Sequence, residues 1–201
     1  ACVRDCRSTA HTSVTGYTPP VDPGTQVDRY VIVERLGEGG MASVYLARHS
    51  ILGSRHAIKV LRPELVALGS VRDRFLAEGR IAAQIRHPYV IDVTDVVIAP
   101  GVAGLVMEYV EGPTLEDWIE AQETLPPLDV VRTIASRVLD GLAEAHAFGV
   151  VHRDLKPANI ILGSTRRGEV RPVVLDFGIA KLGQDSRVEH STRRPTKDGT
   201  R

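Results

Sequence analysis

The chain has 201 residues, of which 43% are hydrophobic, enough for one ordinary domain or two small lobes around a buried core. Lys plus Arg and Asp plus Glu both count 25, so the net charge is zero and no overall field favours nucleic acid or an anionic membrane. Apolar runs stay well short of the roughly 20 residues that cross a bilayer, and no secretory signal pattern begins the chain. We therefore expect a cytoplasmic protein with no membrane segment and no nucleic-acid partner.

The N-terminal part of the chain has no apolar period. It mixes Ser, Thr, Pro, Gly and charged residues, and Pro19, Pro20 and Pro23 exclude a helix there. We predict a disordered leader over residues 1–27.

Short β-rich runs follow from Tyr30 onward and recur near Val44 and Ala57, separated by Gly and polar residues. They predict a small antiparallel sheet, to which residues 93–98 and 103–107 add two strands. The segment Glu108-Tyr109-Val110-Glu111-Gly112 then indicates a turn out of the sheet, and we place a lobe boundary there.

A glycine-rich turn separates the first two predicted strands. Glycines let backbone N–H groups approach phosphate oxygens, because no Cβ stands in the way. A dinucleotide-binding fold has a similar turn, but that turn opens a helix, whereas a strand follows here. The pattern favours a hairpin that covers a nucleotide; the alternative, on this motif alone, is a tight hairpin without a ligand. The turn and its flanks comprise Leu36, Gly37, Glu38, Gly39, Gly40, Met41, Ala42, Ser43 and Val44.

Lys59 lies in an otherwise apolar strand, where a lone lysine is usually just solvated. However, residues from about 71 to 85 predict one isolated helix, and Glu78 lies on it, 19 residues after Lys59, among apolar positions that face the sheet. A carboxylate on a buried face needs a cation. We therefore predict a Lys59–Glu78 ion pair that aims the ammonium at phosphate oxygens.

Beyond residue 112 the periodicity becomes helical. A short helix fits Leu115 to Ile119, and a longer one runs over about 131–145, with Gly149 suited to its C-terminal cap. Two short strands, 160–162 and 172–175, flank a polar insertion that indicates a hairpin loop. Residues 183–201 are charged, rich in Ser and Thr, and aperiodic, so we expect them to be mobile.

The strongest signal is Val-His-Arg-Asp-Leu-Lys-Pro-Ala-Asn at 151–159, followed by Asp-Phe-Gly at 176–178. A carboxylate that accepts a hydroxyl proton, a nearby lysine and two metal-binding oxygens are what phosphoryl transfer from Mg-ATP requires. Each motif alone is compatible with an ordinary solvated turn or strand end. All of them in this order make that explanation very improbable.

Together these motifs resemble the protein kinase family, specifically the bacterial serine/threonine kinases whose loop reads Gly-x-Gly-Gly-Met, over about residues 30–181. The resemblance implies an α+β, protein-kinase-like fold. Residues 28–110 would form a small antiparallel-sheet lobe with one control helix, and residues 111–182 an incomplete, mainly helical large lobe. Residues 183–201 would be part of the activation segment.

The resemblance also implies roles for the site residues. Lys59 would hold the α- and β-phosphates of ATP, and Lys156 would neutralise the γ-phosphate. Asp154 would orient and deprotonate the substrate hydroxyl, and Asn159 with Asp176 would hold Mg²⁺, for which Mn²⁺ is an alternative. Lysine two residues after Asp154 is typical of Ser/Thr kinases, so the expected partners are ATP and protein substrates with Ser or Thr acceptors. Adenine would be held by Leu36, Val44, Ala57, Met107, Ile161 and the backbone of Glu108 and Val110.

The match has two departures. Ala42 replaces the third glycine of the phosphate loop, and we expect weaker or slower nucleotide binding at most. After residue 178 there is no Ala-Pro-Glu and none of the remaining large-lobe helices, so Ile134, Val138 and Leu142 are expected to face water.

Two functional hypotheses stay open at this point. The first is a signalling Ser/Thr kinase whose sequence is cut within the activation segment, as a fragment or through a frameshift. The second is a catalytically incompetent nucleotide-binding or regulatory module. Dimerisation is compatible with either hypothesis, but no motif indicates it.

Overall fold

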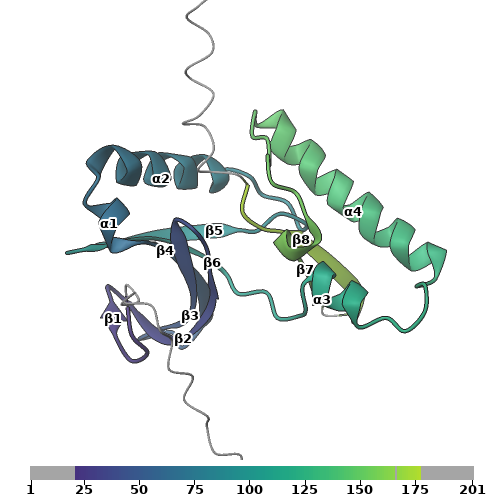
Figure 1. Ribbon diagram of the computed structural model, residues 1–201, viewed down its shortest axis with the longest axis horizontal. Helices are drawn as coiled ribbons and strands as arrows, with labels where there is room; N and C mark the ends of the chain where they lie inside the picture. The colour runs from purple at the N-terminus through teal and green to yellow at the C-terminus, as the bar shows by residue number, and fades with distance from the viewer. Residues whose placement is uncertain (1–20, 166, 178–201) are drawn as a thin grey trace, which may run out of the picture.

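The computed structural model describes residues 21–165 and 167–177, which form a sheet lobe and a smaller helical lobe (Figure 1). The sheet lobe contains one six-stranded antiparallel sheet in the order β1-β2-β3-β4-β6-β5. Its strands are β1 (Gln26–Val27), β2 (Tyr30–Glu38), β3 (Ala42–His49), β4 (Arg55–Leu61), β5 (Val93–Ala99) and β6 (Val102–Glu108). Two helices, α1 (Pro63–Val66) and α2 (Gly69–Ala82), lie between β4 and β5.

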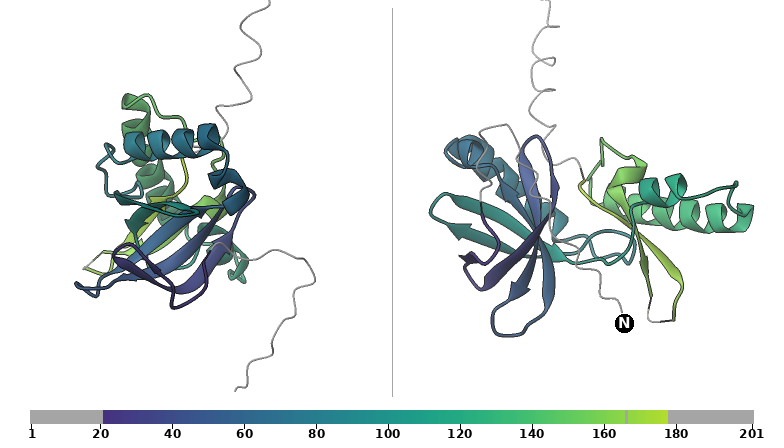
Figure 2. Two further views of the ribbon diagram at one scale, coloured as in Figure 1. Left: turned by 90° about the vertical axis from the view of Figure 1, so that its left-hand side faces the viewer. Right: turned by 60° about the horizontal axis from the view of Figure 1, so that its bottom comes forward.

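The sheet is strongly curled, so its two faces have different partners (Figure 2). The concave face encloses one apolar cluster, to which β4 contributes the fully buried Ile58 and Val60. Alternation along β4 turns Ala57, Lys59 and Leu61 to the opposite face, where α2 packs. The sequence pattern of β4 therefore both closes the lobe and presents Lys59 on the side of the helix.

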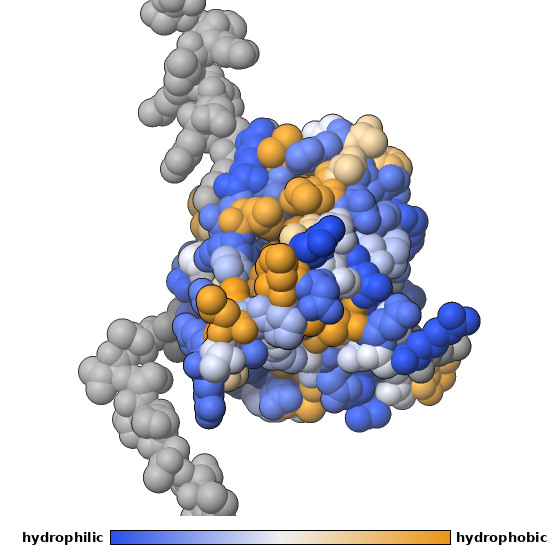
Figure 3. Space-filling model, turned by 90° about the vertical axis from the view of Figure 1, so that its right-hand side faces the viewer, coloured by the Kyte–Doolittle hydropathy of each residue, from blue (hydrophilic) through white to orange (hydrophobic). Residues whose placement is uncertain are grey.

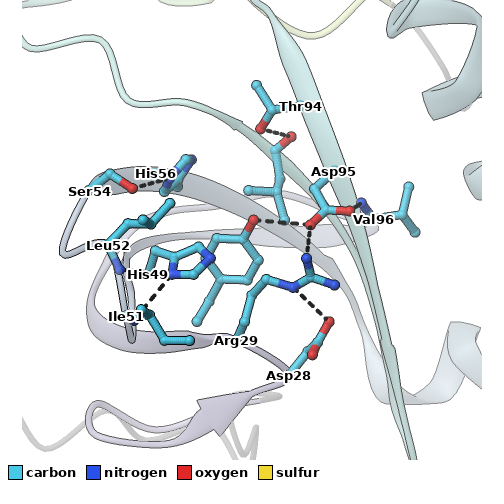
Figure 4. Close-up of polar contacts among 12 residues, drawn as sticks. Asp28, Arg29, His49, Ile51, Leu52, Ser54, His56, Thr94, Asp95 and Val96 are labelled. Atoms are coloured by element: carbon cyan, nitrogen blue, oxygen red, sulfur yellow. Dashed lines mark hydrogen bonds and ion pairs between the residues drawn. The ribbon is translucent and has the colours of Figure 1, made fainter.

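A polar cluster links the two ends of the curled sheet (Figure 4). The Tyr30 hydroxyl on β2 donates to the Asp95 carboxylate on β5 at 3.1 Å, and Arg29 lies 3.9 Å from the same carboxylate. The rings of His49 and His56 pack edge-on against the Tyr30 ring. Burial, followed by the hydrogen bond to Asp95, raises the pKa of Tyr30 to about 12, so this hydroxyl stays a donor at physiological pH.

Close packing of α2 on β6 depends on Gly79. A Cβ at Gly79 would stand 2.3 Å from a methyl carbon of Leu105, which is itself only 1% exposed. Any larger residue would push the helix away from the sheet. Because Glu78 precedes Gly79, this contact also sets how deeply Glu78 lies in the lobe.

The helical lobe contains α3 (Leu115–Glu120), α4 (Leu128–Ala147), the 3-10 helix η1 (Pro157–Asn159) and a hairpin of β7 (Ile160–Ser164) and β8 (Val170–Val174). A capping box between Thr114 and Asp117 begins α3. The hairpin packs on α4, and it joins the sheet lobe through Val174, whose N–H donates to the Tyr89 carbonyl and whose carbonyl accepts from the Ile91 N–H.

The structure corrects the predicted exposure of α4. Ile134 and Val138 are 5% and 7% exposed, and Leu142 is partly buried, because all three face the β7–β8 hairpin. The apolar residues that face solvent lie on the other side of the helix, where Leu128 and Leu139 are 72% and 64% exposed. Figure 3 views the molecule from the α4 side and shows apolar side chains spread over this face.

Two neighbouring positions on α4 test this orientation. We expect Val138→Ala to lower the free energy of unfolding by about 1 to 3 kcal/mol, because it opens a cavity against β8. Leu139→Ala should change it by less than about 0.5 kcal/mol. Urea unfolding of both variants measures the difference, and equal losses would contradict the orientation.

The sequence prediction also placed the start of packed structure too late. Val21 and Val27 are buried in the concave cluster, and β1 begins at Gln26, so residues 21–27 belong to the sheet lobe and not to a disordered leader. The rest of the predicted leader, and the predicted mobile segment 183–201, lie outside the described residues. Among the helices of the described ranges, none is both long and apolar enough to cross a membrane.

Candidate active site

The glycine-rich segment forms the turn between β2 and β3, as the sequence predicts. Gly39, Gly40 and Met41 make the tip, which is closed by the Gly39 N–H donating to the Ala42 carbonyl at 2.9 Å. A Cβ would meet no atom within 4 Å at Gly37 or Gly40, so these glycines leave open space beside the backbone. Ala42 is the buried first residue of β3, where its methyl group fits an ordinary strand conformation.

The residues expected around adenine come together from both lobes. Ala57, Met107 and Val110 are buried in one cluster, and the partly buried Val44 and Ile161 pack against it from β3 and β7. Leu36, by contrast, is 44% exposed at the edge of β2 and lies outside this cluster.

The strand that leaves the sheet carries the expected adenine-edge position Glu108. Its N–H already donates to the Asp92 carbonyl at 2.9 Å, which restricts a backbone role in binding to its own carbonyl. Its side chain accepts from Arg171 of β8 at 2.7 Å, an ion pair between the two lobes.

Lys59 does not form the predicted pair with Glu78. Among the described residues its Nζ pairs instead with Asp176 Oδ1, at 2.8 Å. Glu78 does face the sheet as predicted and is 9% exposed, but its buried Oε1 has no hydrogen-bond partner. The helix therefore brings the carboxylate into the lobe without joining it to the lysine.

This environment changes the acidity of Glu78. Burial raises the pKa of its carboxyl above the ordinary 4.5, and the nearby charges of Arg74, Arg153 and Lys59 offset this only in part. A carboxyl whose pKa is raised on folding stabilises the folded state below its ordinary pKa. That contribution is lost as the pH rises through the raised value.

Glu78→Gln is accordingly expected to unfold at a higher temperature than the wild type at pH 7 to 8, because it removes a buried charge without changing the side-chain shape. The difference should shrink toward zero below about pH 4.5, where the wild-type carboxyl is protonated. Thermal unfolding followed across this pH range measures it. A difference that does not change with pH would show that the Glu78 charge is not buried.

The catalytic-loop residues surround Asp154. Lys156 Nζ lies 3.7 Å from Asp154 Oδ2, and Asn159 Nδ2 donates to the Asp154 carbonyl at 2.8 Å. Arg153 has a left-handed φ of 59°, an uncommon conformation for a non-glycine residue and one often found at functional sites.

His152 and Phe177 hold this loop against the end of β8. Their ring centroids are 5.0 Å apart, His152 Nε2 hydrogen-bonds the Leu175 carbonyl at 2.6 Å, and both residues are nearly fully buried. The pair has a structural role, as the sequence analysis expected.

The expected metal ligands flank the β7–β8 hairpin. Asn159 precedes β7, Asp176 follows β8, and the Leu175 N–H donates to the Asn159 carbonyl at 2.8 Å, so the two ends are tied together. Asp176 also has a left-handed φ, of 45°. Because Asn159 uses Nδ2 toward Asp154, its Oδ1 remains for a metal, and amide plus carboxylate oxygens suit Mg²⁺.

A carboxylate, a lysine, an amide and a second carboxylate thus meet where a glycine-rich hairpin and an apolar slot face each other. The Protein kinase domain family model matches residues 30–198. The chain belongs to the protein kinase family.

The curated relatives of this kinase are bacterial. Over 178 residues it is 40% identical to the serine/threonine-protein kinase Pkn1 of Myxococcus xanthus, covering 87% of this chain and 25% of Pkn1. It is 39% identical to serine/threonine-protein kinase PknB of Mycobacterium tuberculosis over 168 residues, covering 82% of this chain and 26% of PknB. The chain therefore spans about a quarter of the length of these relatives.

Solved structures agree with the fold. The crystal structure of the Mycobacterium tuberculosis PknI kinase domain matches with a TM-score of 0.66 and 33% identity, covering 80% of this chain and 64% of that one. The curled sheet lobe and partial helical lobe are thus a kinase-like fold.

Two arginines of the site escaped the sequence analysis. Arg171 reaches Glu108 across 63 positions, and Arg62 reaches Glu38 across 24. Neither lies in a motif, and a contact between distant exposed positions leaves no periodic signal in one sequence.

Proposed function

We propose that this protein is a serine/threonine protein kinase that transfers the γ-phosphate of ATP to Ser or Thr hydroxyls of proteins in bacterial signalling. The observation that carries the proposal is the meeting of Lys59, Asp154, Asn159 and Asp176 in one site, described above, at the junction of the two lobes. Kinase names among the relatives support the same activity.

In the proposed reaction Asp154 accepts the proton of the acceptor hydroxyl while that oxygen attacks the γ-phosphorus. The bond between the γ-phosphorus and the bridging oxygen breaks, and ADP leaves with its electron pair. Lys156, beside Asp154, neutralises charge on the transferred group, and Asn159 with Asp176 would hold Mg²⁺. Bound there, the metal ion would neutralise charge on the phosphates.

Lys59 has to exchange partners for this role. In the structure it neutralises Asp176, whereas catalysis needs the ammonium on the α- and β-phosphates and the carboxylate on the metal. Glu78, buried nearby on α2 without a partner for Oε1, is the group we expect to accept the ammonium when Asp176 is engaged. Because this chemistry consumes ATP, we place the domain in the cytoplasm.

The test is transfer of labelled γ-phosphate from ATP to Ser, Thr and Tyr peptides, with Mg²⁺ or Mn²⁺ and with Asp176→Ala as background. We expect labelled Ser or Thr, no labelled Tyr, and a signal at least about 100-fold above Asp176→Ala. Because the chain spans a quarter of its relatives, both the 201 residues and the whole gene product are assayed. Transfer at the Asp176→Ala level in both would refute the proposed activity.

A further inference from the structure

Glu38 lies at the tip of the phosphate loop between two arginines. Its Oε1 accepts from Arg62 Nη2 at 3.1 Å, and its Oε2 accepts from Arg35 Nη1 at 3.0 Å. Arg62 follows β4 directly and reaches the loop from the neighbouring strand. The same Nη2 donates to the Gly39 carbonyl at 2.8 Å, and the Arg62 backbone N–H donates to the Met41 carbonyl at 3.0 Å.

These contacts bear on what the loop presents to phosphate. A carboxylate beside a triphosphate repels it, and the two guanidinium groups neutralise the Glu38 charge. The Gly39 carbonyl, a second group that would repel phosphate, is held on Arg62. Because the peptide bond is planar and trans, fixing the Gly39 carbonyl on Arg62 points the Gly40 N–H in the opposite direction, away from Arg62.

We propose that Arg62 is a positioning residue for the ATP phosphates, which fastens the loop tip through Glu38 and Gly39 and orients the Gly40 N–H for phosphate. This inference rests on the proposed function, because it assumes that the loop covers ATP. Arg62 is the better held of the two arginines, with its side chain 28% exposed against 45% for Arg35, and it alone contacts the loop backbone.

Arg62→Gln in the 201-residue chain is the direct test, with affinities measured for Mg-ATP and for adenosine. We expect Mg-ATP to bind about three- to tenfold more weakly and adenosine to bind within about twofold of the wild type, because adenosine has no phosphate. Arg48→Gln is the matched control. It removes an arginine from the far end of β3, where the side chain donates to the Gly53 carbonyl, and both affinities should stay unchanged.

A second substitution separates positioning from simple structural support. In the Arg62→Gln background, adding Glu38→Gln should restore part of the Mg-ATP affinity, because it removes the carboxylate that Arg62 no longer neutralises. Arg62→Lys keeps the charge but loses the fork that reaches both Glu38 and Gly39, so an intermediate loss is expected. It also serves as the test variant if Arg62→Gln does not fold.

The outcomes are distinct. Unchanged Mg-ATP affinity in folded Arg62 variants, or equal losses for ATP and adenosine, would overturn the positioning role while leaving the proposed function intact. Failure of Glu38→Gln to restore any affinity would overturn the electrostatic part of the inference. A wild-type chain that binds neither ligand would overturn the proposed function and this inference with it.

Discussion

Asp154→Asn is expected to slow phosphate transfer by the whole gene product about 100- to 10,000-fold and to change Mg-ATP affinity by less than about twofold. Asparagine keeps the shape of the side chain but cannot take the hydroxyl proton. Asp154 contacts Lys156 and Asn159, whereas the glycine-rich loop and Lys59 lie on the other lobe, so the nucleotide keeps most of its contacts.

Single-turnover transfer and equilibrium nucleotide binding measure the two effects separately. Asp140→Asn makes the same chemical change at an exposed position of α4 and should alter neither quantity. If Asp154→Asn weakened binding and transfer equally, Asp154 would be a nucleotide ligand and its assignment to the acceptor hydroxyl would be wrong.

Gly112→Ala is expected to lower the free energy of unfolding by about 2 to 5 kcal/mol. Gly112 lies in the connection between the lobes with φ of 153°, and a Cβ there would stand 2.2 Å from the Leu162 carbonyl oxygen. Backbone on both sides leaves no flexible side chain to move aside, so the connection would have to separate from β7.

Gly101→Ala is the matched control for backbone strain. Gly101 also has a positive φ, of 74°, but a Cβ there would meet no atom within 4 Å. It should cost only about 1 kcal/mol. Urea unfolding of both variants compares them, and equal losses would mean that the contact with Leu162 has no energetic consequence.

Local patterns were enough to predict most of the strands and helices. Alternation in β4 and the glycine-rich turn before β3 are decided by neighbouring residues, so one sequence reveals them. The grouping of Asp154, Asn159 and Asp176 was also predictable, because their motifs lie close along the chain and their resemblance to kinases is specific.

What the sequence did not predict depends on tertiary packing. The buried face of α4 could not be identified, since Val138 and Leu139 are both aliphatic and only the β7–β8 hairpin distinguishes them. Val21 lies in a polar, proline-rich stretch but fills the concave cluster. The partner of Lys59 is a choice between Glu78 and Asp176, which depends on where α2 and residue 176 lie in space.

The attachment of β8 to the sheet lobe limits how the cleft can open. The lobes are joined by the connection around Gly112 and, separately, by the hydrogen bonds of Val174 to Tyr89 and Ile91. A body held at two points can turn only about the line that joins them. Atoms near that line travel little, and Asp176 is two residues from Val174, whereas Gly40 lies at the free tip of a hairpin. Opening would therefore lift the roof of the nucleotide site and leave its metal-binding floor nearly in place.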